Sequence, residues 1–146
     1  MQTASIAESM TGDPVRSDQL EGMMTPLEIV NAFLAAAAKR DYDTALPLLA
    51  EDVEYQNMPI AAVHGREAVK EQLEFLMATT DDGEWRIDRQ LAEGDLVMNE
   101  RVDRFLIGGK WAELPVAGVF VVRDGLITLW RDYFDLQTIM GQLAPS

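Results

Sequence analysis

The pattern of hydrophobic and polar positions changes near the middle of the chain. Between residues 25 and 80, apolar residues recur mostly at spacings of three and four, whereas from Gly83 onward they alternate with polar residues. The first spacing is typical of amphipathic helices and the second of half-buried strands. The pattern therefore predicts an α+β chain in which most helices precede the strands.

The first helix carries the clearest start signal. Thr25 with Glu28 three residues later forms a potential capping box, and Pro26 stands at the first helical position. An apolar stripe then continues towards Arg40, where we expect the helix to end. Three elements are expected before residue 80: a short helix from an Asp43 cap to Ala50, a strand over Asp52–Met58 and a helix over Glu67–Ala78.

The second half of the chain predicts a meander of strands. Alternation predicts strands over 84–91, 96–106, 110–122 and 126–134, separated by short glycine-containing turns. Strands joined so tightly pair antiparallel. Asp135 then caps a last helix that ends near Leu143.

These elements predict a single domain. We expect residues 25–146 to form one curved, mixed but mostly antiparallel sheet shaped as a cone, with helices packed on its concave face. Residues 1–24 are polar and without period, which favours a flexible N-terminal arm.

Composition narrows the possible chemistry. The chain has 12 Lys and Arg against 25 Asp and Glu, a net charge of −13, which argues against nucleic-acid and anionic-membrane partners. Cysteine is absent and His64 is the single histidine, so thiolate chemistry and histidine metal clusters are disfavoured, and we expect no metal or cofactor. No secretory leader or membrane-spanning run is evident, so the cytoplasm is the expected location.

Strand parity places several polar residues among apolar ones, because residues two apart share a face. Arg101 and Asp103 share a face with Val97 and Phe105. By the same rule Asp132 lies with Trp130 and Phe134, and Tyr55 and Asn57 lie with Val53.

Each of these residues also has an ordinary structural interpretation. An Arg and an Asp two apart on a strand usually form a structural ion pair, and an Asp such as Asp132 can protect a sheet edge. Tyr55 and Asn57 could be a hydrogen-bonded pair at the sheet rim, and His64 a loop residue.

Taken together, the polar residues point to acid–base chemistry. Two carboxylates and one guanidinium carry a charge of −1 when all are ionised, and burial disfavours that surplus, so the cluster should keep one proton. Such a cluster offers a proton donor and a base, the two groups that the addition of water to an epoxide requires. Tyr55 and Asn57 could hold the attacking water.

Three separated blocks resemble the limonene-1,2-epoxide hydrolase family, within the superfamily of proteins similar to nuclear transport factor 2. They are Tyr55-Gln56-Asn57-Met58-Pro59, Glu100-Arg101-Val102-Asp103 and Trp130-Arg131-Asp132-Tyr133-Phe134-Asp135. The resemblance runs from about Pro26 to Leu143.

The resemblance implies a role for each candidate residue. It implies that Asp103 is the acid on the epoxide oxygen, that Asp132 is the base on water, that Arg101 bridges them and that Tyr55 and Asn57 hold the water. It also implies a one-step, cofactor-free reaction on a small apolar, cyclic or terpene epoxide in a homodimer. Five residues are implied to line an apolar pocket: Leu34, Phe105, Leu114, Val116 and Ile139. His64 and Glu113 depart from the family pattern, which bears on substrate range.

Two other functions stay open at this stage. A ketosteroid-isomerase-like or polyketide-cyclase-like enzyme on the same fold would need one carboxylate base and a separate oxyanion donor, and an Arg held between two carboxylates suits it poorly. A non-catalytic module that binds apolar ligands would not explain three charged groups placed inside the pocket.

Overall fold

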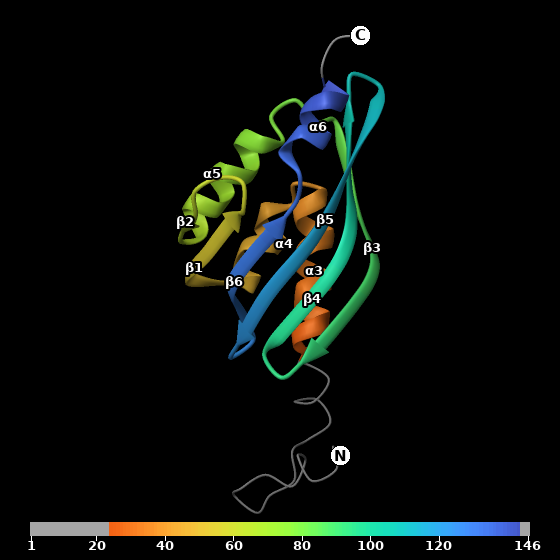
Figure 1. Ribbon diagram of the computed structural model, residues 1–146. Helices are drawn as coiled ribbons and strands as arrows, with labels where there is room; N and C mark the ends of the chain where they lie inside the picture. Colours follow the sequence, from red (N-terminus) through yellow and green to blue (C-terminus); the bar gives the residue numbers. More distant parts are fainter. Residues whose placement is uncertain (1–23, 144–146) are drawn as a thin grey trace, which may run out of the picture.

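The computed structural model describes residues 24–143 and shows one six-stranded sheet with helices on one side of it (Figure 1). The predicted fold class is confirmed, including the curved, mostly antiparallel sheet and the helices on its concave face. Of the arm expected over 1–24, residues 1–23 lie outside the described residues. The elements in chain order are α3 (Pro26–Ala38), α4 (Tyr42–Ala45), a 3₁₀ helix η1 (Leu46–Leu48), β1 (Leu49–Asn57), β2 (Val63–His64), α5 (Arg66–Leu76), β3 (Asp82–Glu93), β4 (Leu96–Ile107), β5 (Lys110–Arg123), β6 (Leu126–Tyr133) and α6 (Leu136–Leu143).

The sheet has the strand order β2-β1-β6-β5-β4-β3. Strands β3 to β6 form the predicted antiparallel meander, and β1 adds to its edge parallel to β6. Strand β2, which has two residues, was not predicted, because so short a strand leaves no period to detect. The β1–β6 pairing sets Asn57 beside Asp132.

The capping box of α3 forms as expected. Glu28 N donates to the Thr25 hydroxyl oxygen (3.1 Å), and Thr25 N donates to the Glu28 carboxylate (2.9 Å). The helix then lies close against β3, where a Cβ on Gly83 would collide with the Ala38 carbonyl oxygen. A residue without a side chain is therefore required where the end of α3 meets the sheet.

The second helix differs from the prediction. Its N-cap is Asp41, which accepts from Thr44 N (3.2 Å), and the helix ends at Ala45 instead of Ala50. Pro47 has no N–H to donate to a continuing helix, so the chain tightens into η1 and enters β1 at Leu49, three residues before the expected start.

Helix α5 differs only slightly from the prediction. It ends at Leu76 instead of Ala78. Leu73 and Met77 are buried as the apolar stripe predicts, but Leu76 is 46% exposed.

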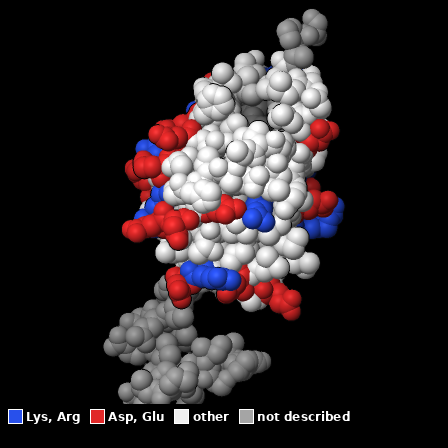
Figure 2. Space-filling model, turned by 60° about the vertical axis from the view of Figure 1, so that its left-hand side comes forward, with Lys and Arg blue, Asp and Glu red and all other residues white. Residues whose placement is uncertain are grey.

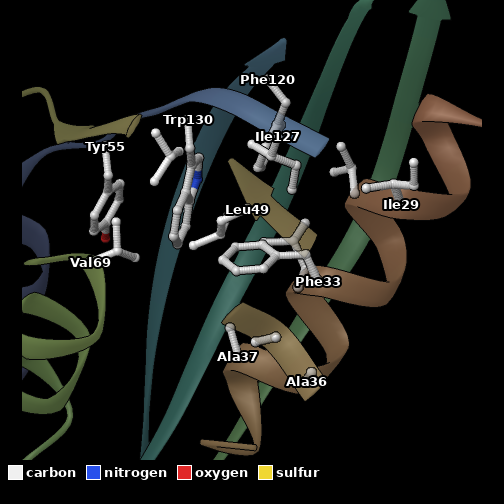
Figure 3. Close-up of a cluster of buried hydrophobic side chains, with 14 of the residues drawn as sticks. Ile29, Phe33, Ala36, Ala37, Leu49, Tyr55, Val69, Phe120, Ile127 and Trp130 are labelled. Atoms are coloured by element: carbon white, nitrogen blue, oxygen red, sulfur yellow. The ribbon is translucent and has the colours of Figure 1, made fainter. Parts of the chain in front are cut away.

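The hydrophobic core lies between α3 and the sheet, and Trp130 is at its centre (Figure 3). The Trp130 ring stacks on Tyr55 with centroids 4.0 Å apart and meets the edge of Phe33 at 4.9 Å. Because Tyr55 and Trp130 are register partners on β1 and β6, this stacking joins the two strands that hold the candidate site.

Candidate active site

Three charged side chains are buried together on the inner face of the sheet. Arg101 and Asp103 come from β4 and Asp132 comes from β6, and their exposed fractions are 1%, 5% and 4%. The alternation of β4 places both of its residues on the inner face, as strand parity predicts.

The Arg101 guanidinium forms a forked pair with each carboxylate. It donates to both Asp103 oxygens, from Nε (3.0 Å) and NH2 (2.9 Å). It also donates to both Asp132 oxygens, from NH1 (3.1 Å) and NH2 (2.8 Å). Two bidentate pairs on one planar group hold both carboxylates in a fixed relation.

Asn99 and Trp130 add further hydrogen bonds to Arg101 and Asp132, while the buried Asn99 Nδ2 has no partner. Asn99 Oδ1 accepts from Arg101 NH1 (3.0 Å), so the five N–H donors of Arg101 meet five acceptors. The indole Nε1 of Trp130 donates to Asp132 Oδ1 (2.8 Å). Asp132 Oδ2 accepts one hydrogen bond, from Arg101 NH2, so this oxygen keeps the larger acceptor capacity for a water molecule.

Tyr55 and Asn57 form a second buried polar pair beside Asp132. The Asn57 amide nitrogen donates to the Tyr55 hydroxyl oxygen (2.9 Å). Asn57 is the register partner of Asp132, and Met58 N donates to the Asp132 carbonyl oxygen (2.9 Å). The structure thus brings together all five polar residues that the sequence singled out.

The electrostatics of the cluster shift the pKa values of Asp103, Tyr55 and Arg101. Burial raises the pKa of Asp103 above the ordinary value, against the opposing effect of Arg101, and the Asp132 charge adds to the increase. Burial also raises the pKa of Tyr55, with a contribution from Asp132, which keeps its phenol neutral. Burial alone would lower the pKa of Arg101, but the Asp132 and Asp103 charges outweigh it, so the Arg101 pKa is raised and the guanidinium stays charged.

A cavity of about 310 Å³ opens in front of these residues. Tyr55, Asn57, Asp103 and Asp132 line its polar part. Most of the remaining wall is apolar and comes from α5, α6 and strands β3 to β5. Figure 2 shows a hollow near the upper end of the molecule, surrounded by largely uncharged residues, at the height where α5 and α6 lie in Figure 1.

Four of the five predicted pocket residues line this cavity: Phe105, Leu114, Val116 and Ile139. Leu34 does not line it and is 1% exposed within the core. The helical stripe predicts that Leu34 points inward, but not whether it faces the cavity or the packed interior.

Several contributors were not predicted as site residues. Leu73 and Met77 line the cavity, and sequence reasoning treated them as core positions of a helix. Asn99 was also missed, although strand parity puts it on the face of Val97 and Arg101 and could have found it.

The two residues that depart from the family pattern lie away from the cavity wall. His64 is exposed and its Nε2 is 3.4 Å from Glu54 Oε1. The Glu113 carboxylate pairs with Arg104 at the surface (2.9 Å), while its backbone exchanges hydrogen bonds with the Gln142 side chain of α6. Over residues 24–143, no group of three or more His, Asp or Glu side chains is arranged to hold a metal ion. None of the helices described has the length and hydropathy needed to cross a membrane.

Comparison with known proteins gives concordant matches. Residues 24–145 match the catalytic domain of limonene-1,2-epoxide hydrolase. The chain is 38% identical to the epoxide hydrolase EphG of Mycobacterium tuberculosis over 107 residues, which cover 73% of this chain and 71% of the relative.

Solved structures agree on the fold. A structure of an M. tuberculosis epoxide hydrolase of the limonene-epoxide-hydrolase type is 36% identical, with a TM-score of 0.71 over 81% of this chain and 88% of the other. A SnoaL-like polyketide cyclase fold from Shewanella putrefaciens CN-32 is 17% identical, with a TM-score of 0.75 over 83% and 97% of the two chains. At that identity the second match speaks for the fold alone.

Proposed function

The chain belongs to the limonene-1,2-epoxide hydrolase family, and we propose that this epoxide hydrolase adds water to a small apolar, cyclic or terpene epoxide in one step, giving a vicinal diol. The observation that carries the proposal is the Arg101 fork between two buried carboxylates, of which Asp103 has its pKa raised by burial. Such a cluster supplies an acid and a base at fixed separation in the same cavity.

The proposed reaction uses each group once. Asp132 takes a proton from water as the water oxygen attacks an epoxide carbon. The carbon–oxygen bond of the ring breaks, and Asp103 gives its proton to the leaving oxygen. One proton returned from Asp132 to Asp103 through solvent then restores the cluster, so no cofactor is consumed.

Tyr55 and Asn57 are proposed to hold the attacking water. Both line the cavity, and Asn57 is in register with Asp132. The Asn57 Oδ1 can accept from water while Asp132 Oδ2 accepts the second water hydrogen, which leaves the water lone pair directed at the substrate.

The cavity supports an apolar substrate of modest size. Its volume of about 310 Å³ is at the lower end of the range typical of ligand sites. Its apolar walls hold carbon rings or chains, and the cluster at its polar end is the place for the epoxide oxygen. We further propose a cytoplasmic homodimer, which size-exclusion chromatography with light scattering would test.

The acid and base roles are tested by isosteric substitutions. We expect Asp103→Asn and Asp132→Asn each to lower kcat for cyclohexene oxide by roughly 100- to 10,000-fold, since an amide neither gives nor takes the proton. Asp88→Asn is the matched control, because Asp88 pairs with Arg86 at the surface (2.8 Å). Activity of Asp103→Asn close to that of the parent would refute the acid assignment.

The one-step mechanism is tested by isotope labelling. In a single turnover with excess enzyme in H₂¹⁸O, the label should appear in the diol and the protein mass should stay unchanged. Label in Asp103 or Asp132 would demonstrate a covalent ester and exclude the one-step reaction. Binding of the epoxide without turnover by the parent protein would favour a non-catalytic module.

A further inference from the structure

The site depends on a side chain that crosses an intervening strand. Asn99 on β4, Gly118 on β5 and Asp132 on β6 are register partners in one row across the sheet. Neighbouring strands lie roughly 4.8 Å apart, so β4 and β6 are separated by about twice that distance. Arg101 of β4 can therefore reach Asp132 of β6 only by passing over β5.

Gly118 provides the space for this crossing. A Cβ built at Gly118 would lie 2.5 Å from Arg101 NH1, 2.8 Å from Asn99 Oδ1 and 3.0 Å from Asp132 Oδ1. The end of an Arg side chain usually moves aside from such a contact. Here the guanidinium is fully buried and all its donors are engaged, so it has no alternative position with equal hydrogen bonding.

Asn99 fixes the guanidinium from the side of β4. The four bonds from Arg101 to the two Asp residues leave one NH1 hydrogen, and Asn99 Oδ1 accepts it at 3.0 Å. Asn99 is itself 5% exposed, so water does not readily replace this acceptor. Because a guanidinium only donates, the amide must present its oxygen to Arg101.

We propose that Asn99 and Gly118 are positioning residues for the hydrolysis reaction, which hold the Arg101 guanidinium in the plane that aligns Asp103 with Asp132. The inference rests on the proposed function, because it assigns a purpose to the alignment of acid and base. Neither residue lines the cavity, so both act on the reaction through Arg101 and not on the substrate. Loss of either should affect kcat far more than KM.

The role of Asn99 is tested by a pair of substitutions that differ in one oxygen. Asn99→Ala removes the acceptor and should lower kcat for cyclohexene oxide by roughly 10- to 100-fold, with KM changed by less than about threefold. Asn99→Ser restores an oxygen that can accept, one bond closer to the backbone than Asn99 Oδ1, and should recover part of the loss. If Asn99→Ala fails to fold, Asn99→Cys, of similar size to serine but a weak acceptor, takes its place in the comparison.

A half-buried asparagine whose side-chain oxygen has no hydrogen-bond partner serves as the control. Asn31 Oδ1 is buried on α3 and has no hydrogen-bond partner, so Asn31→Ala should keep the parent kcat. A kcat of Asn99→Ala within about twofold of the parent, or equal kcat values for the Ala and Ser variants, would overturn the role of Asn99.

Gly118 is tested in the same way. Gly118→Ala should lower kcat by roughly 10- to 100-fold with little change in KM, whereas Gly141→Ala, where an added Cβ meets no atom within 4 Å, should not. An unchanged kcat for Gly118→Ala would overturn the spacing argument. If the parent protein is inactive on epoxides, the proposed function is rejected. If the parent and its Asn99 and Gly118 variants are all active, only the positioning role of these two residues is rejected.

Discussion

Replacement of Arg101 by lysine tests whether the site needs a planar fork or only a positive charge. Arg101→Lys keeps the charge but exchanges five donors in a fixed plane for three on a compact ammonium. The Arg101 side chain is 0% exposed, so water has no ready access to the acceptors that lysine leaves unsatisfied.

The magnitude follows from the count of hydrogen bonds. Five bonds of 2.8–3.1 Å leave the guanidinium, and an ammonium can supply at most three. Each hydrogen bond to a charged group contributes about 1.5–3 kcal/mol, so losing two should lower the free energy of unfolding by about 3–6 kcal/mol. A typical domain has about 5–15 kcal/mol in total, so the variant should fold but with a much reduced margin. Because one ammonium cannot align both carboxylates, kcat should fall by about 100-fold or more.

A matched control exists on the other face of the same strand. Arg104 pairs with Glu84 (3.1 Å) and Glu113 (2.9 Å) near the surface, and its side chain is 23% exposed. Arg104→Lys should change the free energy of unfolding, measured by urea denaturation, by less than about 1 kcal/mol and leave kcat near the parent value. Equal losses of stability in Arg101→Lys and Arg104→Lys would refute the reasoning from burial, and a normal kcat in a folded Arg101→Lys would refute the reasoning from geometry.

Three further outcomes are expected. Thr25→Ala removes the capping box of α3 and should lower the free energy of unfolding in urea by about 1 kcal/mol, and an unchanged midpoint would show that the cap contributes nothing. Asp103 has a raised pKa in the folded state, so its contribution to stability is fully present below the pKa of an unfolded Asp, about 4, and is lost as the pH rises through its folded pKa. The stability of the parent relative to Asp103→Asn should therefore decrease as the pH rises, whereas a constant difference would contradict burial of an ionisable group. Leu114→Trp narrows the cavity and should lower kcat/KM for a terpene epoxide by about tenfold or more relative to cyclopentene oxide. Equal effects on the two substrates would show that Leu114 does not determine substrate selectivity.

Local periodicity accounts for what could be predicted from the sequence. Arg101, Asp103 and Asp132 are buried because each shares a strand face with apolar residues, and two-residue periodicity is a direct consequence of strand geometry. The sequence predicts the helix boundaries less accurately. The sequence pattern predicts an Asp43 cap, whereas Asp41 caps this helix in the structure, a difference of two residues at a helix end that local signals do not resolve.

Local sequence patterns do not predict the position of the Arg101 side chain, because that position depends on which strands are neighbours in the sheet. Asp103 lies on β4 and Asp132 lies on β6. Arg101 can contact both because the strand register places Gly118 of β5, which has no side chain, between the two strands. In the sequence, Gly118 is one glycine within an alternating strand, a position where glycine normally weakens a sheet. The register reverses that interpretation, because a side chain at this position would occupy the space of the guanidinium. In this sheet, Gly118 in the central strand β5, between Asn99 and Asp132, therefore marks the place where the Arg101 side chain crosses.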